Sequence, residues 1–211
     1  MFSTKKLNLD DLNTGDLLLF NNSNPTGISS ILTYLIKYGT HSNYSHVAMV
    51  LRDPVFLSPT LKGVFVWESS WEGKPDPQDG LIKLGVQITP IHEIMEDYKD
   101  DIVVARKIQN AENIFTPEKL KQIHDVVYDK PYDVMPQDWL GALFHRDLHP
   151  QKTDRFWCSA LVGYIYTQCG ILEESTDWSI LRPNDFSLDG ENLNYANDHI
   201  TLALLESKFT L

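Results

Sequence analysis

The chain has 211 residues, enough to bury one substantial core, and its 42% apolar and 22% charged residues are usual for a globular protein. Its formal net charge of −11, without a dense run of Lys and Arg, argues against nucleic-acid binding. The sequence holds no apolar stretch of the roughly 20 residues that span a membrane, and none of signal-peptide length follows Lys5 and Lys6. We therefore predict one cytoplasmic domain over residues 1–211, without a signal peptide, in which a core at 15–170 carries a C-terminal extension, 171–211.

Five short segments predict β-strands, because they are rich in aliphatic residues or alternate between apolar and polar side chains. They are residues 16–20, 45–51, 63–68, 80–88 and 101–107. In the third segment Val64, Val66 and Glu68 fall on one face, since the side chains of a strand alternate. We expect the second and third segments to pair as antiparallel neighbours.

Five further segments predict helices from apolar residues at helical spacing. They are residues 28–38, 90–97, 117–128, 137–144 and 156–169. Residues 28–36 are apolar enough to touch a membrane surface, although burial in the core is the preferred interpretation. The last helix carries two mostly apolar rows, so we expect it to be buried, with Thr153 or Asp154 as its N-cap and Gly170 as its stop. This arrangement favours an α+β fold with a central antiparallel sheet packed against helices.

The two cysteines, Cys158 and Cys169, lie at opposite ends of the last predicted helix. Along one helix their spacing corresponds to about 16 Å, whereas a disulfide needs Cα atoms within about 7 Å. A helix N-terminus favours negative charge, so Cys158 is the candidate for a reactive thiolate. The alternative is that Cys158 is a small core residue, as free cysteines in apolar helices usually are.

A thiolate nucleophile needs a proton acceptor and a group that orients the acceptor. His46 begins one predicted strand and Glu68 ends the next, so their side chains can meet at the rim of a sheet. Taken alone, His46 also fits a surface or capping histidine, and Glu68 a solvated carboxylate. If the three residues act together, the Cys158 sulfur lies within about 4 Å of a ring nitrogen of His46.

Four segments carry a resemblance to a known family. They are residues 15–20 (GDLLLF), 44–50 (YSHVAMV), 130–133 (KPYD) and 156–162 (FWCSALV). Over residues 15–170 the chain resembles the circularly permuted branch of the NlpC-type papain-like cysteine hydrolases. This branch includes bacterial and poxviral members and the lecithin:retinol acyltransferase-like enzymes.

The resemblance implies a papain-like domain with a catalytic triad of His46, Glu68 and Cys158. In that superfamily one strand supplies the His, the following strand a polar partner, and the start of a buried helix the Cys. Glu72 is the alternative partner of His46, because the family varies this residue. The implied chemistry is attack of the Cys158 thiolate on a carbonyl carbon and formation of an acyl-enzyme, without a cofactor.

Three functions fit these residues. The first is hydrolysis of an amide or peptide bond. The second is a lipid acyl hydrolase or acyltransferase, favoured by the permuted order and by Phe156 and Trp157 beside the cysteine, although these aromatics also fit a core. The third is a non-catalytic binding or virion-structural protein, which the presence of all three polar residues disfavours. The sequence leaves the substrate and the oligomeric state open.

Other titratable groups give weaker signals for a ligand site. His145 and His149 bracket Asp147 at a spacing that suits a metal on a helix, but no further ligands are apparent. The acidic residues at 97, 100 and 101 lack the spacing of a calcium loop. We therefore predict no metal site.

Overall fold

The computed structural model describes residues 3–21, 43–133 and 153–209. The helices predicted at 28–38 and 137–144 lie outside the described residues, as do His145, Asp147 and His149. Within the described ranges no helix is long and apolar enough to cross a membrane.

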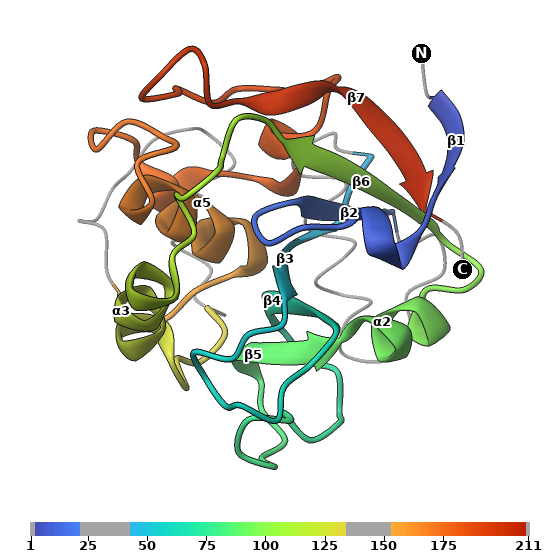
Figure 1. Ribbon diagram of the computed structural model, residues 1–211, viewed down its shortest axis with the longest axis vertical. Coiled ribbons are helices and arrows are strands. Elements are labelled where there is room, and N and C mark those ends of the chain that lie inside the picture. Colours follow the sequence, from blue (N-terminus) through green and yellow to red (C-terminus); the bar gives the residue numbers. More distant parts are fainter. Residues whose placement is uncertain (1–2, 22–42, 134–152, 210–211) are drawn as a thin grey trace.

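One seven-stranded sheet organises the molecule, in the order β1-β7-β6-β2-β3-β4-β5 (Figure 1). Every neighbouring pair is antiparallel except β1 and β7, which are parallel. The strands are β1 (Ser3–Leu7), β2 (Leu17–Asn21), β3 (His46–Arg52), β4 (Val64–Ser70), β5 (Gly85–Pro90), β6 (Ile102–Ile108) and β7 (Leu202–Phe209). The α+β class and the antiparallel sheet are confirmed, and β1 and β7 are strands that the sequence did not predict.

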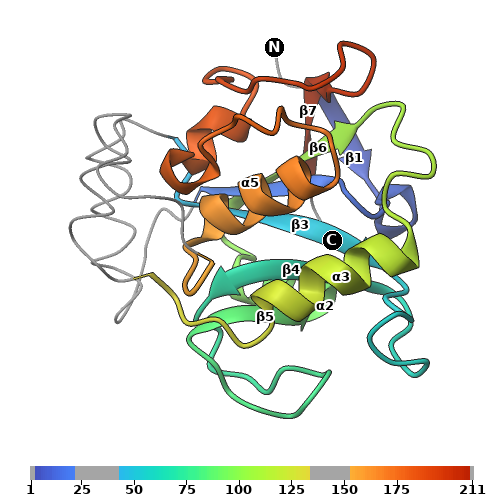
Figure 2. The same ribbon diagram turned by 90° about the vertical axis from the view of Figure 1, so that its left-hand side faces the viewer.

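In the described ranges three α-helices pack against this sheet: α2 (Ile91–Asp97), α3 (Pro117–Val127) and α5 (Cys158–Gln168). Short 3-10 helices are η1 (Leu9–Asp11), η2 (Trp178–Ile180) and η3 (Pro183–Phe186). Helices α3 and α5 lie on one side of the sheet and α2 on the other (Figures 1 and 2). The larger hydrophobic core fills the α5 side and the smaller one the α2 side.

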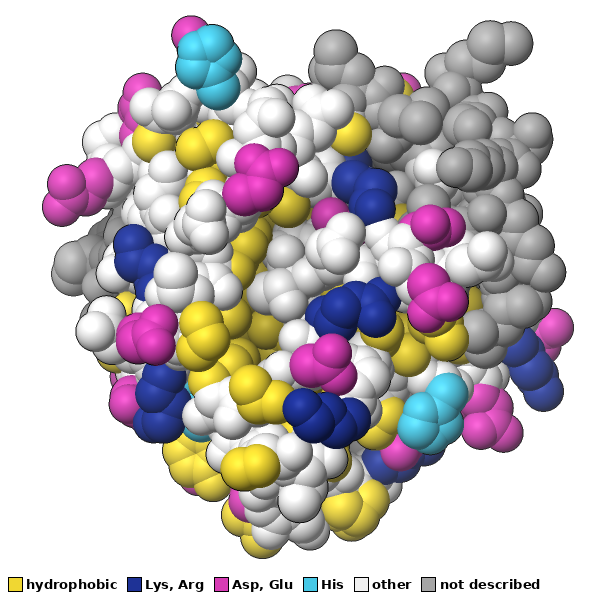
Figure 3. Space-filling view, viewed as in Figure 1, with side chains coloured by type: hydrophobic (Ala, Val, Ile, Leu, Met, Phe, Trp, Pro, Cys, Tyr) yellow, Lys and Arg dark blue, Asp and Glu magenta, His cyan; other side chains and the backbone are white. Residues whose placement is uncertain are grey.

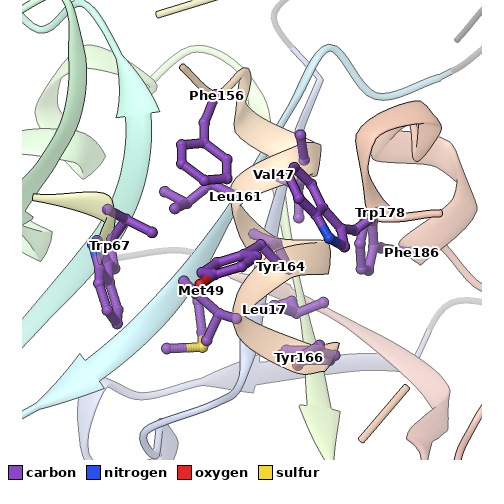
Figure 4. Packing of buried hydrophobic residues seen from close by; sticks show 14 of the residues in the cluster. Leu17, Val47, Met49, Trp67, Phe156, Leu161, Tyr164, Tyr166, Trp178 and Phe186 are labelled. Carbon is purple, nitrogen blue, oxygen red and sulfur yellow. The ribbon is translucent and has the colours of Figure 1, made fainter. Parts of the chain in front are cut away.

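Helix α5 is central, as predicted. Nine of its eleven residues are buried. Figure 4 shows its side chains Leu161 and Tyr164 among Val47 and Met49 of β3 and Trp178 of the C-terminal extension. Apolar side chains therefore surround α5 on all sides, which explains its two apolar rows.

The predicted N-cap of α5 is wrong. The helix begins at Cys158, so Thr153 and Asp154 lie too far upstream to cap it. Phe156 pairs with Tyr132 in an isolated parallel bridge, which keeps the chain extended up to the N-cap residue Trp157. The Trp157 side chain makes no capping hydrogen bond to the helix. The first turn therefore keeps backbone N–H groups available to other acceptors.

Strand β5 begins at Gly85, later than predicted, because residues 75–82 form a loop closed by the bridge between Pro75 and Ile82. This loop covers the outer edge of β5. The Ile88 N–H donates to Asp76 Oδ2 at 3.3 Å, and the Val86 N–H donates to the Lys130 carbonyl at 2.9 Å. The edge strand thus has partners outside the sheet.

Candidate active site

The register of β3 and β4 brings His46 and Glu68 together. Met49 pairs with Trp67 and Val50 with Val66, which confirms the predicted antiparallel pairing. Continued by one pair, this register places Glu68 opposite Ala48, and His46, two residues further along β3, is then the diagonal neighbour of Glu68 on the same face. Their side chains meet, with His46 Nε2 at 2.8 Å from Glu68 Oε2.

Glu68 is held from a second side by β5. The Thr89 hydroxyl donates to Glu68 Oε1 at 2.6 Å, and the Glu68 side chain is fully buried. The ring of Phe20 packs against His46 with centroids 5.2 Å apart. Both the carboxylate and the imidazole are therefore fixed in orientation by neighbouring strands.

Cys158 contacts His46 from helix α5, which lies on the side of the sheet opposite α2. It is the first residue of α5, is 2% exposed, and forms a side-chain hydrogen bond with His46. Because Nε2 of His46 is engaged by Glu68, the nitrogen left for the sulfur is Nδ1. The sulfur also accepts hydrogen bonds from the backbone N–H groups of Val47 and Ser159. The sulfur thus takes one of the N–H groups that the missing N-cap leaves open.

The electrostatics of this pair favour a thiolate and an imidazolium. Burial alone would raise the pKa of the Cys158 thiol, but the hydrogen bond and charge of His46 lower it below its usual range. Burial alone would lower the pKa of His46, but Cys158 and Glu68 raise it to about 10. Both shifts have the same physical cause, since each charge stabilises the other in a site that excludes water.

Tyr132 is a site residue to which the sequence assigned no role. Its segment, 130–133, carried the resemblance, and its hydroxyl is hydrogen-bonded to Cys158. The Tyr132 N–H donates to the Leu84 carbonyl at 3.1 Å, and the residue pairs with Phe156. Backbone contacts with Leu84 and Phe156 therefore hold Tyr132 next to the Cys158 sulfur.

Glu72, the alternative partner of His46, has a different partner. Its Oε1 accepts from the Ser70 hydroxyl at 2.8 Å, and the Gln87 amide donates to the same hydroxyl at 3.0 Å. Burial, together with the negative charge of Glu68, raises the pKa of Glu72 to about 7. Glu72 thus lies beside the site as a second acidic group, while Glu68 contacts the imidazole.

Cys169 is in a different environment from Cys158. Both cysteines are free and buried, in agreement with the prediction that they do not pair. Burial raises the pKa of Cys169 to about 12. The described part of the chain therefore contains one thiol prepared to ionise and one that is not.

Among the described residues, no three His, Cys, Asp or Glu side chains are grouped so that they could hold a metal ion. The acidic residues at 97, 100 and 101 are within this part of the chain, whereas the histidines at 145 and 149 are outside it.

No protein-family model matches the chain, and no curated protein is similar to it at a significant level. The fold is similar to that of a solved structure titled metalloprotein YiiX, DUF1105, from Escherichia coli O157:H7. The two chains superpose with a TM-score of 0.50 at 18% sequence identity, over 92% of this chain and 98% of the other. At this identity the likeness concerns the fold alone.

Proposed function

We propose that this protein is a cysteine-dependent hydrolase with a permuted NlpC-type papain-like domain. The observation that carries the proposal is the position of His46, which is hydrogen-bonded to Cys158 through one ring nitrogen and to Glu68 through the other. Covalent acyl transfer needs a nucleophile, a base and a carboxylate that orients the base, each hydrogen-bonded to the next.

The mechanism begins with attack of the Cys158 thiolate on a carbonyl carbon. His46 gives its Nδ1 proton to the leaving group as the tetrahedral intermediate collapses to a thioester. Water then attacks the thioester, with His46 accepting its proton, and the acid is released. Glu68 keeps the ring oriented and stabilises the imidazolium throughout.

The oxyanion of the tetrahedral intermediate needs donors close to the sulfur. The backbone N–H of Cys158 is the first, because it lies in the first turn of α5 and has no partner within that helix. The Tyr132 hydroxyl is the second, since it already bonds to the sulfur.

We place hydrolysis of an amide or peptide bond first among the possible reactions, with a lipid acyl hydrolase or acyltransferase as the alternative of the same fold. A non-catalytic binding or virion-structural role is the third candidate. The complete burial of Glu68 speaks against the third, because a buried carboxylate costs free energy that a merely structural strand end does not require.

The test is covalent labelling of the full chain with two thiol-directed vinyl sulfones, one peptide-like and one with a long alkyl chain. Mass spectrometry then maps the modified residue. We expect labelling of Cys158, its loss in Cys158→Ser and a strong decrease in His46→Ala. Cys169→Ser is the matched control and keeps full labelling. Failure of both probes to label Cys158, or equal labelling of Cys169, contradicts the proposal, and the faster probe identifies the substrate class.

A further inference from the structure

The connection between β4 and β5 gathers much of the exposed apolar surface. The described residues include eight large hydrophobic side chains that are exposed, and four of them come from residues 71–84. They are Trp71 at 51%, Leu81 at 53%, Ile82 at 56% and Leu84 at 45% exposed. We call residues 71–84 the apolar loop. This concentration within one connection differs from the exposed hydrophobics that every protein carries singly along its chain.

Internal bonds hold the apolar loop in shape. The Asp76 N–H donates to the Leu81 carbonyl at 2.8 Å, next to the bridge between Pro75 and Ile82. The Asp76 carboxylate accepts from the Gln78 N–H at 2.9 Å. Leu81 and Ile82 are therefore exposed on a fixed turn, and a change of loop conformation is not needed to present them.

All charges of the apolar loop except that of Glu72 are paired. Lys83 contacts Asp76 at 3.1 Å and Asp79 at 2.5 Å, and Lys74 contacts Asp97 of α2 at 2.8 Å. The two lysines and three acidic residues at 72, 76 and 79 leave this segment with a formal charge of −1, in a chain of −11. An anionic surface would repel this negatively charged protein, whereas a surface without net charge would not.

The size and shape of this surface favour a lipid over a protein. The apolar loop extends beyond β5 at the lower end of the molecule (Figures 1 and 2), where hydrophobic side chains lie between charged ones (Figure 3). Four half-exposed side chains present roughly a few hundred Å², against the ~800 Å² per partner of a stable protein interface. A Trp beside aliphatic residues on a projecting turn suits the boundary between lipid headgroups and acyl chains.

We propose that the apolar loop docks the protein on a zwitterionic lipid surface by inserting Trp71, Leu81, Ile82 and Leu84. The inference does not depend on the catalytic proposal, because none of these side chains belongs to the triad.

The docking surface adjoins the candidate active site. The Leu84 carbonyl accepts from the backbone N–H of Tyr132, whose hydroxyl bonds to Cys158. At the other end of the apolar loop, Trp71 directly precedes Glu72, the second acidic group of the site. A lipid surface bound here therefore lies close to the candidate active site.

Co-sedimentation of the full chain with phosphatidylcholine vesicles tests the proposal. We expect binding to weaken at least tenfold in the double variant Leu81→Glu/Ile82→Glu. The matched control, Val55→Glu/Ile102→Glu, alters two hydrophobic side chains that are exposed elsewhere, at 42% and 44%, and binds as the wild type does. An unchanged alkylation rate of Cys158 verifies that the loop variant is folded.

Trp71 supplies an independent readout. We expect its fluorescence to shift to the blue and to be quenched by brominated phosphatidylcholine, and Trp71→Phe to abolish both changes. The proposal is overturned if wild-type protein does not bind at millimolar lipid, if binding requires added phosphatidylserine, or if the control double variant weakens equally. Self-association that only the loop variant loses would also overturn it, in favour of a protein interface.

Discussion

The difference between the two cysteines allows a quantitative test of the ion pair. At pH 7 a group with the pKa of Cys169, about 12, is ionised in about one molecule in 10⁵. An ordinary exposed thiol is ionised to a few per cent at that pH, and a thiol paired with an imidazolium mostly so. Replacing His46 by Ala removes the imidazolium and leaves Cys158 buried, so its thiolate falls to a few per cent or less. We expect its alkylation to slow at least about 30-fold.

The assay is the rate of iodoacetamide modification of each cysteine, followed by mass spectrometry between pH 5 and pH 10. In wild type the Cys158 rate should rise at a lower pH than that of an ordinary thiol, because the pKa of Cys158 is lowered. In His46→Ala the rise should move to higher pH, while the Cys169 rate stays low in both proteins. A Cys158 profile that is the same in both proteins would falsify the ion pair.

Three further variants test the surroundings of the site. Glu72→Gln should have the same free energy of unfolding as wild type at pH 4, but one up to about 3 kcal/mol higher at pH 8. The Glu72 carboxyl, with its folded pKa raised to about 7, destabilises the wild type as pH rises from the unfolded pKa to that value, and the loss is complete above it; equal gains at both pH values in denaturant titrations contradict this. Thr89→Val should lower the free energy of unfolding by about 1–3 kcal/mol, because it leaves Glu68 Oε1 without its donor. An unchanged unfolding midpoint contradicts this prediction. Gly85→Ala should lower the melting temperature more than Gly63→Ala. Both glycines have positive φ, but only at Gly85 would a Cβ lie 2.2 Å from a backbone oxygen. Equal decreases in melting temperature contradict the steric reason.

The local parts of the fold were predictable because they depend on neighbours in the chain. Helix α5 followed from its two apolar rows, and β3 and β4 from short aliphatic runs. Strands β1 and β7 were not predicted, since Ser3–Leu7 is mostly polar and becomes a strand only through its pairing with Leu202–Phe209. Such pairing between distant segments leaves no periodic signal in either one.

The candidate site was predictable in its three principal residues but incomplete in its environment. Placement at a strand start, a strand end and a helix start made His46, Glu68 and Cys158 candidates, and the resemblance to the permuted papain-like family joined them into one triad. The choice between Glu68 and Glu72 required the register of β3 and β4, which the sequence does not state. Tyr132 could not be assigned because its position depends on backbone pairing with segments far away in the chain.

The place of β7 in the sheet has a consequence for biosynthesis. Strand β1 leaves the ribosome early, but its one partner in the described sheet, β7, comes near the last residues of the sequence. Until then β6 also presents an unpaired edge, which is a site for association with other chains. The nascent chain can assemble β3 and β4, the strands that carry His46 and Glu68, while this edge is still open. Completion of the sheet therefore waits for the synthesis of β7, and this interval is when the chain most needs protection by a chaperone.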